Sequence, residues 1–579
     1  MHKTATEVVA RCSELKKFWE PRNAKMRSWY KLIEMVDELK TDKMESFVGN
    51  DPRAMYNLVL HMLDAEVPHR VDDFNITDME VISAAASVGE FLTTAWKDIA
   101  RNFRRTNPRQ SFNRTRIGFL LATGWYAEFS MITDDGSKAF VDVWNPAEVY
   151  PMWDGDSGLS EVAHITNISA KQARALCIRN GWLVDNYAQV KDVKVYDYWW
   201  SETVEEYPFD TVICNAVVID TKLVKCEPTR FRSWPIYVAP VGGLPDMGAL
   251  TEGSELSTSS YQAGATVKSD RWKEELGQSI VATNEHIYRT WNKWWSFSLQ
   301  LLRDTAQPRI FERSRSGKAI VRPEDVFRRG AIFRGGADDS VEFMSTPPMP
   351  LELRSTQLDL EAMMQRGGVS WSMFGSVQGQ LTAYVMSQIA ASANQVMKPF
   401  HQAIIALNED EDNDWLADIR ARGVQPYSWK LPDKLPKDTL VSADYEVEIP
   451  GDLVQRATVA RMLDPDFRLS YSYVVGKLFP DIRDRLKERA QIRVDKAELH
   501  PTNSIIALVQ YYRQQATFLR SRDVGDEDSA RLYDLAAEAA MAQLGMSTEQ
   551  PRPGRVPGMG RPEALPQRLP LPPGTELPE

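Results

Sequence analysis

Few residues of this 579-residue chain have the types and spacing that catalysis or metal binding requires. The acidic pairs Asp134-Asp135 and Asp338-Asp339 could supply carboxylate oxygens to magnesium. Each pair lies close to a glycine in a turn-like stretch, so we interpret both as solvated loops. Three histidines are isolated in the sequence and give no ligand spacing: His164, His286 and His401.

Motifs for nucleotide binding and hydrolysis are missing as well. Ser316-Gly317-Lys318 is similar to the end of a phosphate-binding loop, but no glycine stands at the upstream distance that this loop requires. Neither HExxH nor GxSxG occurs. The sequence therefore predicts a protein that is not an enzyme, with no catalytic residue, no metal and no cofactor. Four cysteines without CxxC spacing are expected to be reduced thiols: Cys12, Cys177, Cys214 and Cys226.

Charge and composition narrow the class of protein further. The chain carries a net charge of −11, whereas a protein that grips duplex DNA is expected to show a basic stripe toward the phosphates. A surface past which DNA slides is compatible with this charge. The most apolar run, Ile117–Phe129, is shorter than the ~20 residues of a membrane span and contains Glu128. The N-terminus has no continuous apolar core of a signal peptide, so we expect a soluble chain.

The first 250 residues read as a mixed α+β unit. Apolar side chains at helical spacing predict helices within 4–40, 78–104 and 116–124. A β-hairpin is predicted over 125–133 and 138–144, with the turn at 134–137. Further along, the patterns predict an extended segment at 145–154, a helix over 160–182, and strands at 193–201 and 212–226.

A very long helix is predicted after the Gly/Ser/Thr-rich stretch 246–268. From Ser269 to Ala306 there is no proline, and apolar residues recur in steps of three, four and seven. Its tryptophans, Trp291, Trp294 and Trp295, could stack on bases, but their spacing favours helix packing. An Arg-rich insert at 308–349 follows, which contains eight basic and six acidic residues.

Two more helices are predicted beyond this insert. The first covers Leu351–Arg366 and ends at Gly367-Gly368, and the second covers about 381–407 and ends in the acidic run Glu409–Asp412. A short strand is expected at Asp444–Ile449, a largely helical region at 452–545, and a disordered tail over the last 29 residues, which hold nine prolines.

The order of these parts resembles the portal, or head-to-tail connector, proteins of tailed bacteriophages, in particular those of podoviruses. Portals run wing, stem helix, clip, stem helix, tunnel loop, long helix and crown. Local stretches add to the resemblance: Arg53–Arg70 (RAMYNLVLHMLDAEVPHR), Asn145–Asp154 (NPAEVYPMWD) and Val195–Trp200 (VYDYWW).

The resemblance implies an α+β, mainly helical portal fold in a homo-oligomeric ring, typically a dodecamer. It implies the following segments: wing 1–268, first stem helix 269–307, clip 308–349, second stem helix 350–366, tunnel loop 367–380, long helix and returning strand 381–451, crown 452–549 and tail 550–579. The second stem helix looks shorter than the first.

The resemblance also implies roles for particular residues. The clip would dock partner proteins through its basic side chains: Arg309, Arg313, Arg315, Lys318, Arg322, Arg328, Arg329 and Arg334. The tunnel loop would face DNA through neutral residues: Ser370, Trp371, Ser372, Met373, Phe374, Ser376, Gln378 and Gln380. Four glycines would act as its hinges: Gly367, Gly368, Gly375 and Gly379.

The partners implied are other copies of the chain, the large terminase subunit, the head–tail adaptor and tail proteins, the major capsid and scaffold proteins, and double-stranded DNA, but no membrane. The implied location is the capsid vertex of the virion after assembly in the host cytoplasm. Two alternatives stay open: another structural virion component, such as an internal ejection protein or a tail adaptor, and a packaging enzyme. An ejection protein would be nearly all helical, and an enzyme would need a phosphate loop or a carboxylate metal site.

Overall fold

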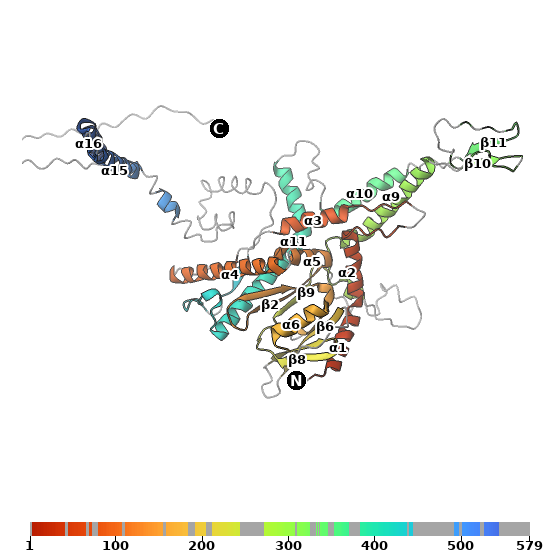
Figure 1. Cartoon of the computed structure of the whole chain (residues 1–579), viewed down its shortest axis with the longest axis horizontal. Helices are drawn as coiled ribbons and strands as arrows, with labels where there is room; N and C mark the ends of the chain where they lie inside the picture. Colours follow the sequence, from red (N-terminus) through yellow and green to blue (C-terminus); the bar gives the residue numbers. More distant parts are fainter. Residues whose placement is uncertain are drawn as a thin grey trace, which may run out of the picture. The chain divides into compact units, whose positions relative to one another are not determined.

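The computed structural model of the chain (Figure 1) describes most of the first 443 residues and two segments near the C-terminus. The described residues are 3–40, 45–64, 69–71, 79–106, 111–154, 158–182, 192–203, 211–243, 271–306, 310–315, 317–322, 324, 332, 334, 336–344, 352–369, 383–436, 439–443, 491–496, 501–521 and 526–543. They belong to two compact units, Met1–Arg483 and Asp484–Glu579.

Five helices form most of the N-terminal part; four lie close to the predicted ranges, and α3 was not predicted as a separate helix. Thr4 and Glu7 form a capping box that starts the first helix, and Gly124 ends the last one with a φ of 70°. The helices are α1 (Ala5–Phe18), α2 (Glu20–Ile33), α3 (Asp51–Leu63), α4 (Met79–Thr106) and α5 (Phe112–Thr123).

The predicted hairpin and strand-rich block are confirmed as two antiparallel sheets. The first has the order β3-β2-β9 and the second the order β4-β5-β6-β7-β8. The strands of the first sheet are β2 (Trp125–Ile132), β3 (Ala139–Val143) and β9 (Ile236–Pro240). Those of the second are β4 (Val149–Asp154, after the 3-10 helix η1 Pro146–Glu148), β5 (Gly158–Ser169), β6 (Asp192–Thr203), β7 (Thr211–Ile219) and β8 (Lys222–Pro228).

The prediction of a helix over the whole of 160–182 is wrong. Residues up to Ser169 form β5, which pairs with β4 on one side and β6 on the other. Only α6 (Ala170–Asn180) is helical, and it starts where the Ser169 side chain and Gln172 form a capping box. Central pairing in the sheet overrides the helical preference of the sequence.

The single long helix predicted over Ser269–Ala306 is also wrong. The structure has a short helix α8 (Arg271–Glu275), a 3-10 helix η3 (Ala282–Asn284) and then α9 (Glu285–Ala306). Between α8 and η3 the chain is not helical and bonds to distant segments instead. Gln278 N donates to Val241 O and Ile280 N to Leu121 O, each at a distance of 2.9 Å. A Cβ on Gly277 would lie 2.4 Å from Trp125 Nε1, so the missing side chain permits this close packing.

The insert after α9 contains a β-hairpin, β10 (Ile310–Arg313) paired with β11 (Ser340–Phe343). It is followed by α10 (Glu352–Arg366), which ends as predicted and is shorter than α9. The long helix α11 (Ala383–Arg422) does not end in the acidic run, contrary to the prediction, because Glu411 and Asp412 are buried and paired inside the fold. A 3-10 helix η5 (Pro426–Ser428) follows, and β12 (Val441–Ala443) pairs with β1 (His69–Val71).

The core of this unit lies on both faces of the five-stranded sheet. Along β7, Cys214, Ala216 and Val218 join the main cluster with α1 and α2. The alternate residues Val217 and Ile219 pack against α6. A second cluster joins α4, α5, β3 and the end of α11. The predicted α+β class, mainly helical, is confirmed.

The second unit contains a helical hairpin, α15 (Pro501–Arg520) and α16 (Glu527–Gln543). Its buried residues are few and small, mainly Ala516, Ala530 and Ala537. Residues 491–496 are also helical. The strand expected at Asp444–Ile449 and the Pro-rich tail lie outside the described residues, as does most of 452–500.

Candidate functional site

The helix pair α9 and α10 projects from the body of the first unit (Figure 1). The β10–β11 hairpin belongs to the segment that connects the two helices. At its base, the Asn284 side-chain amide donates to Met364 O over 2.8 Å. This bond joins the start of α9 to the last turn of α10. Asn284 is buried, and the Gly367 Cα lies so close that a Cβ there would be 2.0 Å from Asn284 Oδ1.

Glu285 anchors α9 to α2 at the same base. Its carboxylate accepts hydrogen bonds from Ser28 Oγ and Trp29 Nε1, each over 2.9 Å, and forms ion pairs with Lys25 and Arg289. Burial alone would raise the pKa of Glu285, but the bonds from Arg289, Lys25 and Ser28 outweigh it and hold the pKa at about 2. Glu285 is therefore ionised at any physiological pH.

A strap of chain outside helices and strands, residues 45–50, runs along α9. Its alternate backbone N–H groups, those of Glu45, Phe47 and Gly49, donate to side chains spaced one helical turn apart: Gln300 Oε1 at 3.2 Å, Ser296 Oγ at 2.9 Å and Asn292 Oδ1 at 2.9 Å. Two extended residues advance about 6.7 Å and four helical residues about 6 Å, so the two spacings match. The Phe47 and Trp295 ring centroids lie 5.5 Å apart.

Burial differs along the helix pair. Trp291 and Trp294 are buried, which confirms packing for these two rings. Other large apolar side chains of α9 and α10 face solvent in the single chain: Phe297 (63% exposed), Leu302 (56%), Leu358 (60%) and Met363 (48%). Such side chains on neighbouring helices are typical of surfaces that bind a protein.

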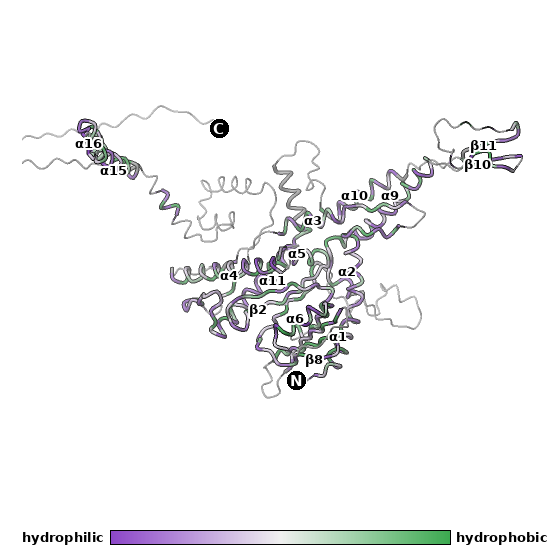
Figure 2. The backbone as a smooth tube through the Cα atoms, in the orientation of Figure 1, coloured by the Kyte–Doolittle hydropathy of each residue, from purple (hydrophilic) through white to green (hydrophobic). Residues whose placement is uncertain are grey.

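The described basic residues of the insert are all exposed: Arg313, Arg315, Lys318, Arg322 and Arg334. Figure 2 shows both hydrophilic and hydrophobic stretches along this insert, where Phe311, Ile332 and Met344 are exposed as well. Arg315 pairs with Asp338 over 3.0 Å, and Glu312 accepts bonds from the Ile320 and Val321 N–H groups and so orders the turn beside β10. Arg309, Arg328 and Arg329 lie outside the described residues.

The segment predicted to face DNA, Ser370–Gln380, lies outside the described residues, as do Gly375 and Gly379. Its neighbours are described. Gly367 and Gly368 follow α10 directly, and Val369 is buried in the main core. The segment therefore starts at a fixed point next to the α9–α10 base.

The far end of α11 is fastened by a buried polar cluster that the sequence analysis missed. Arg116 of α5 contacts Glu128 of β2 and Glu411 of α11, and Asp412 accepts from Trp96 Nε1 over 2.9 Å and contacts His69 Nδ1. Glu128 interrupts an apolar run, and an acid in such a run is a signal that a buried partner exists elsewhere. Arg116 is only 12 residues from Glu128, but sequence spacing could not show that the same arginine also contacts Glu411, which is far away along the chain.

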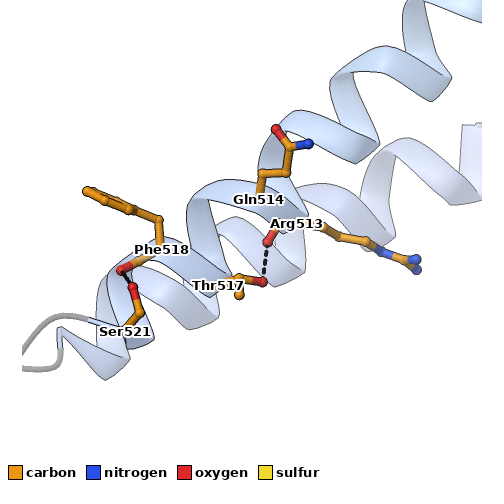
Figure 3. A pocket seen from close by; sticks show the side chains of 5 residues that line it. All are labelled: Arg513, Gln514, Thr517, Phe518 and Ser521. Atoms are coloured by element: carbon orange, nitrogen blue, oxygen red, sulfur yellow. Dashed lines mark hydrogen bonds between the residues drawn. The ribbon is translucent and has the colours of Figure 1, made fainter.

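On the second unit, one face of α15 lines an open pocket of about 420 Å³ (Figure 3). Its residues are Arg513, Gln514, Thr517, Phe518 and Ser521, and the Thr517 hydroxyl donates to Arg513 O in the same helix. Phe518 is exposed, as are Leu508 and Tyr511 on α15 and Leu532 and Leu535 on α16. This hairpin thus leaves large apolar side chains uncovered in the single chain.

Neither a metal site nor a membrane span is found in the part of the chain that the structure describes. No group of three or more His, Cys, Asp or Glu side chains there is arranged to hold a metal ion. No described helix combines the length and the apolar character needed to cross a bilayer.

Comparison with known proteins gives a weak likeness in structure. No protein-family model matches the sequence, and no curated protein does. Solved structures that are similar include a chain from the neck of an empty gene transfer agent (GTA) particle with C6 symmetry: TM-score 0.39, 12% identity, 74% of this chain and 90% of that one. A chain from the neck of a native GTA particle with C12 symmetry has a TM-score of 0.34 and 13% identity, over 74% of this chain and 99% of that one. A chain from the virion of a native GTA particle has a TM-score of 0.35 and 12% identity, over 73% of this chain and 98% of that one.

Proposed function

We propose that this chain is the portal subunit of a tailed bacteriophage, a non-enzymatic protein whose copies form a ring at one capsid vertex. Twelve copies would surround a channel through which DNA enters during packaging and leaves during ejection. Motor activity would belong to the terminase, since the sequence offers no nucleotide site.

The observation that carries this proposal is the α9–α10 pair. Two helices are locked together at their base by Asn284 and fastened to the body by Glu285 and the strap 45–50. Yet large apolar side chains on both helices, Phe297 and Leu358 among them, face solvent in the single chain. A rigid pair with uncovered apolar side chains is suited to pack against its own copies, and a heterologous contact of this kind forms a ring when the rotation between successive copies closes.

The β10–β11 hairpin is suited to the role of the clip. Five of its basic side chains are exposed within an acidic chain. Arginines bind carboxylates and phosphates in a planar, bidentate manner, so they suit docking to acidic partner surfaces. In this proposal the clip docks the large terminase subunit first and the head–tail adaptor and tail proteins afterwards.

The segment 370–380 would line the channel. In sequence it connects the buried Val369 to α11, which Arg116 fastens through Asn408 and Glu411. Its uncharged residues would let phosphates slide, because attraction multiplied over many subunits would hold the DNA in place. Major capsid and scaffold proteins would contact the outer part of the ring in the virion.

The solution mass of the purified full chain tests the proposal, with variants at the exposed stem residues. Phe297→Glu and Leu302→Glu should reduce assembly into a large oligomer at least tenfold, because they place charges in an apolar contact. Ile178→Glu is the matched control: Ile178 is 62% exposed but lies on α6, away from the stem. If all three substitutions change assembly into the large oligomer equally, a ring held together by the stem is contradicted.

A further inference from the structure

Two carboxylates share one edge of the Arg116 guanidinium. Arg116 Nε donates to Glu128 Oε1 over 3.0 Å, and Nη2 contacts Glu411 Oε2 at 3.5 Å. Nε and Nη2 form the edge that ordinarily binds the two oxygens of a single carboxylate. The remaining nitrogen, Nη1, donates to Asn408 Oδ1 over 3.0 Å. One cation thus stands against two acids at close range.

All three charged residues are withdrawn from water. Arg116 is 5% exposed, Glu128 1% and Glu411 0%. Each acid also keeps one buried oxygen, Glu128 Oε2 and Glu411 Oε1, that has no hydrogen-bond partner among the described residues. Burial of an ionised carboxylate is costly unless its charge and its lone pairs are both compensated, and here one positive charge serves two carboxylates.

The groups around the pair do not supply the missing positive charge. His69 contacts Asp412, so its ring is already engaged with a third acid. The neutral hydroxyl of Ser130 of β2 hydrogen-bonds to Glu411 and opposes the rise of its pKa, but it supplies no charge. The other titratable groups that face the cluster are acids or phenols from β2, β3, β9 and α11: Asp142, Asp410, Asp414, Tyr126 and Tyr237.

We propose that Glu128 and Glu411 form a proton-binding site, which holds one proton at neutral pH and uses it to fasten α11 to α5 and β2. One carboxylate takes up a proton from solvent and becomes a carboxylic acid, and the pair then carries a single negative charge opposite Arg116. The new O–H is a hydrogen-bond donor, which suits the two orphaned oxygens. This role is separate from the portal function.

The direction of the pKa shifts agrees with this assignment. Burial raises the pKa of both acids, and the charge of Glu128 raises that of Glu411 further, while Arg116 opposes the shift. An acid whose pKa is raised by folding stabilises the fold below its unfolded pKa, near 4.5, and this contribution is lost as the pH rises through the folded value. Alkaline conditions should therefore loosen the attachment of α11.

Infrared spectroscopy of the full chain at pH 8 tests the proposal, because protonated carboxyls absorb separately from carboxylates. The other buried acid with a raised pKa of about 6, Asp197, is mostly ionised at this pH. The wild type should show a carboxyl band that Glu128→Gln and Glu411→Gln each remove, since either variant leaves one carboxylate for Arg116. Glu90→Gln, an exposed glutamate of α4, should leave the band unchanged.

A wild-type spectrum without a protonated carboxyl band would overturn the proposal, and so would a band that persists in both Gln variants. Thermal unfolding gives a second readout: the melting temperature of the wild type should fall more steeply between pH 6 and 9 than that of Glu411→Gln. Equal slopes would also contradict a bound proton. Neither readout depends on ring formation or packaging, so the proposed function can fail while this site holds, or the reverse.

Discussion

The side-chain amide of Asn284, the residue before α9, donates a hydrogen bond to the backbone carbonyl of Met364 at 2.8 Å, and this contact ties the start of α9 to the last turn of α10. The contact is buried and leaves no room for a side chain at Gly367. The helices that carry the hairpin are therefore set at a fixed angle where they leave the body. This geometry leads to a prediction about the pair.

Gly367→Ala should destabilise the chain by about 1–3 kcal/mol, because its Cβ would collide with the Asn284 side chain. Asn284→Ala alone should cost about 1–2 kcal/mol through the lost hydrogen bond. In the double variant the collision is absent, so its cost should be well below the sum of the two. Denaturant unfolding measures all three, and additive costs would show that the two residues do not interact.

Asn292→Ala and Ser296→Ala should release the strap from α9 without unfolding the body. Each removes the acceptor of one strap N–H, so amide exchange at Gly49 and Phe47 respectively should become about five- to tenfold faster. Thr290→Ala is the control, because that hydroxyl bonds only to His286 O in its own helix. Equal effects of the control and the two variants would contradict the ladder.

Glu285→Gln should lower the melting temperature by several degrees at pH 7, because two cations and two neutral donors lose an ionised acceptor. The pKa of Glu285 is depressed to about 2, so its contribution is complete above the unfolded pKa of about 4.5 and disappears as the pH falls toward 2. The difference from wild type should shrink over that window. Glu14→Gln, on the exposed side of α1, should change little at any pH.

Replacing Ser370–Gln380 with a Gly/Ser linker of equal length, which keeps the buried Val369, should leave ring assembly intact and reduce the amount of DNA packaged. The reason is that a flexible linker cannot hold a defined surface toward the moving duplex. An equal-length replacement within 246–268, which the sequence also predicts to be a loop, serves as the control. Normal packaging with the first replacement would contradict the proposed role of this segment in the channel.

Local patterns predicted much of this fold. The turn Asp134–Ser137 identified the β2–β3 hairpin, apolar periodicity identified α4, and Gly367-Gly368 identified the end of α10. These features depend on neighbours in sequence, which is why one sequence is enough to find them.

The errors came from contacts between distant residues. The helix predicted from Ser269 was broken because Gly277 packs against Trp125 and the following N–H groups bond to Val241 and Leu121. Likewise, the acidic run looked like a solvated helix end, but Arg116 holds Glu411 inside the fold. Periodicity contains no information on such partners.

The candidate site was found in outline but not in its anchors. The order of helix, basic insert and helix was predicted from the sequence, and the role of the basic residues of the insert in docking stays a prediction. Asn284, Glu285 and the strap 45–50 were not predicted, because each acts through a partner more than 70 residues away. Their residue types alone are ordinary.

Electron microscopy of the purified full chain tests the central claim most directly. The portal proposal predicts closed rings, with a central channel wide enough for duplex DNA, in which the α9–α10 stems of neighbouring copies contact each other. Compact dimers or tetramers without a channel would contradict it.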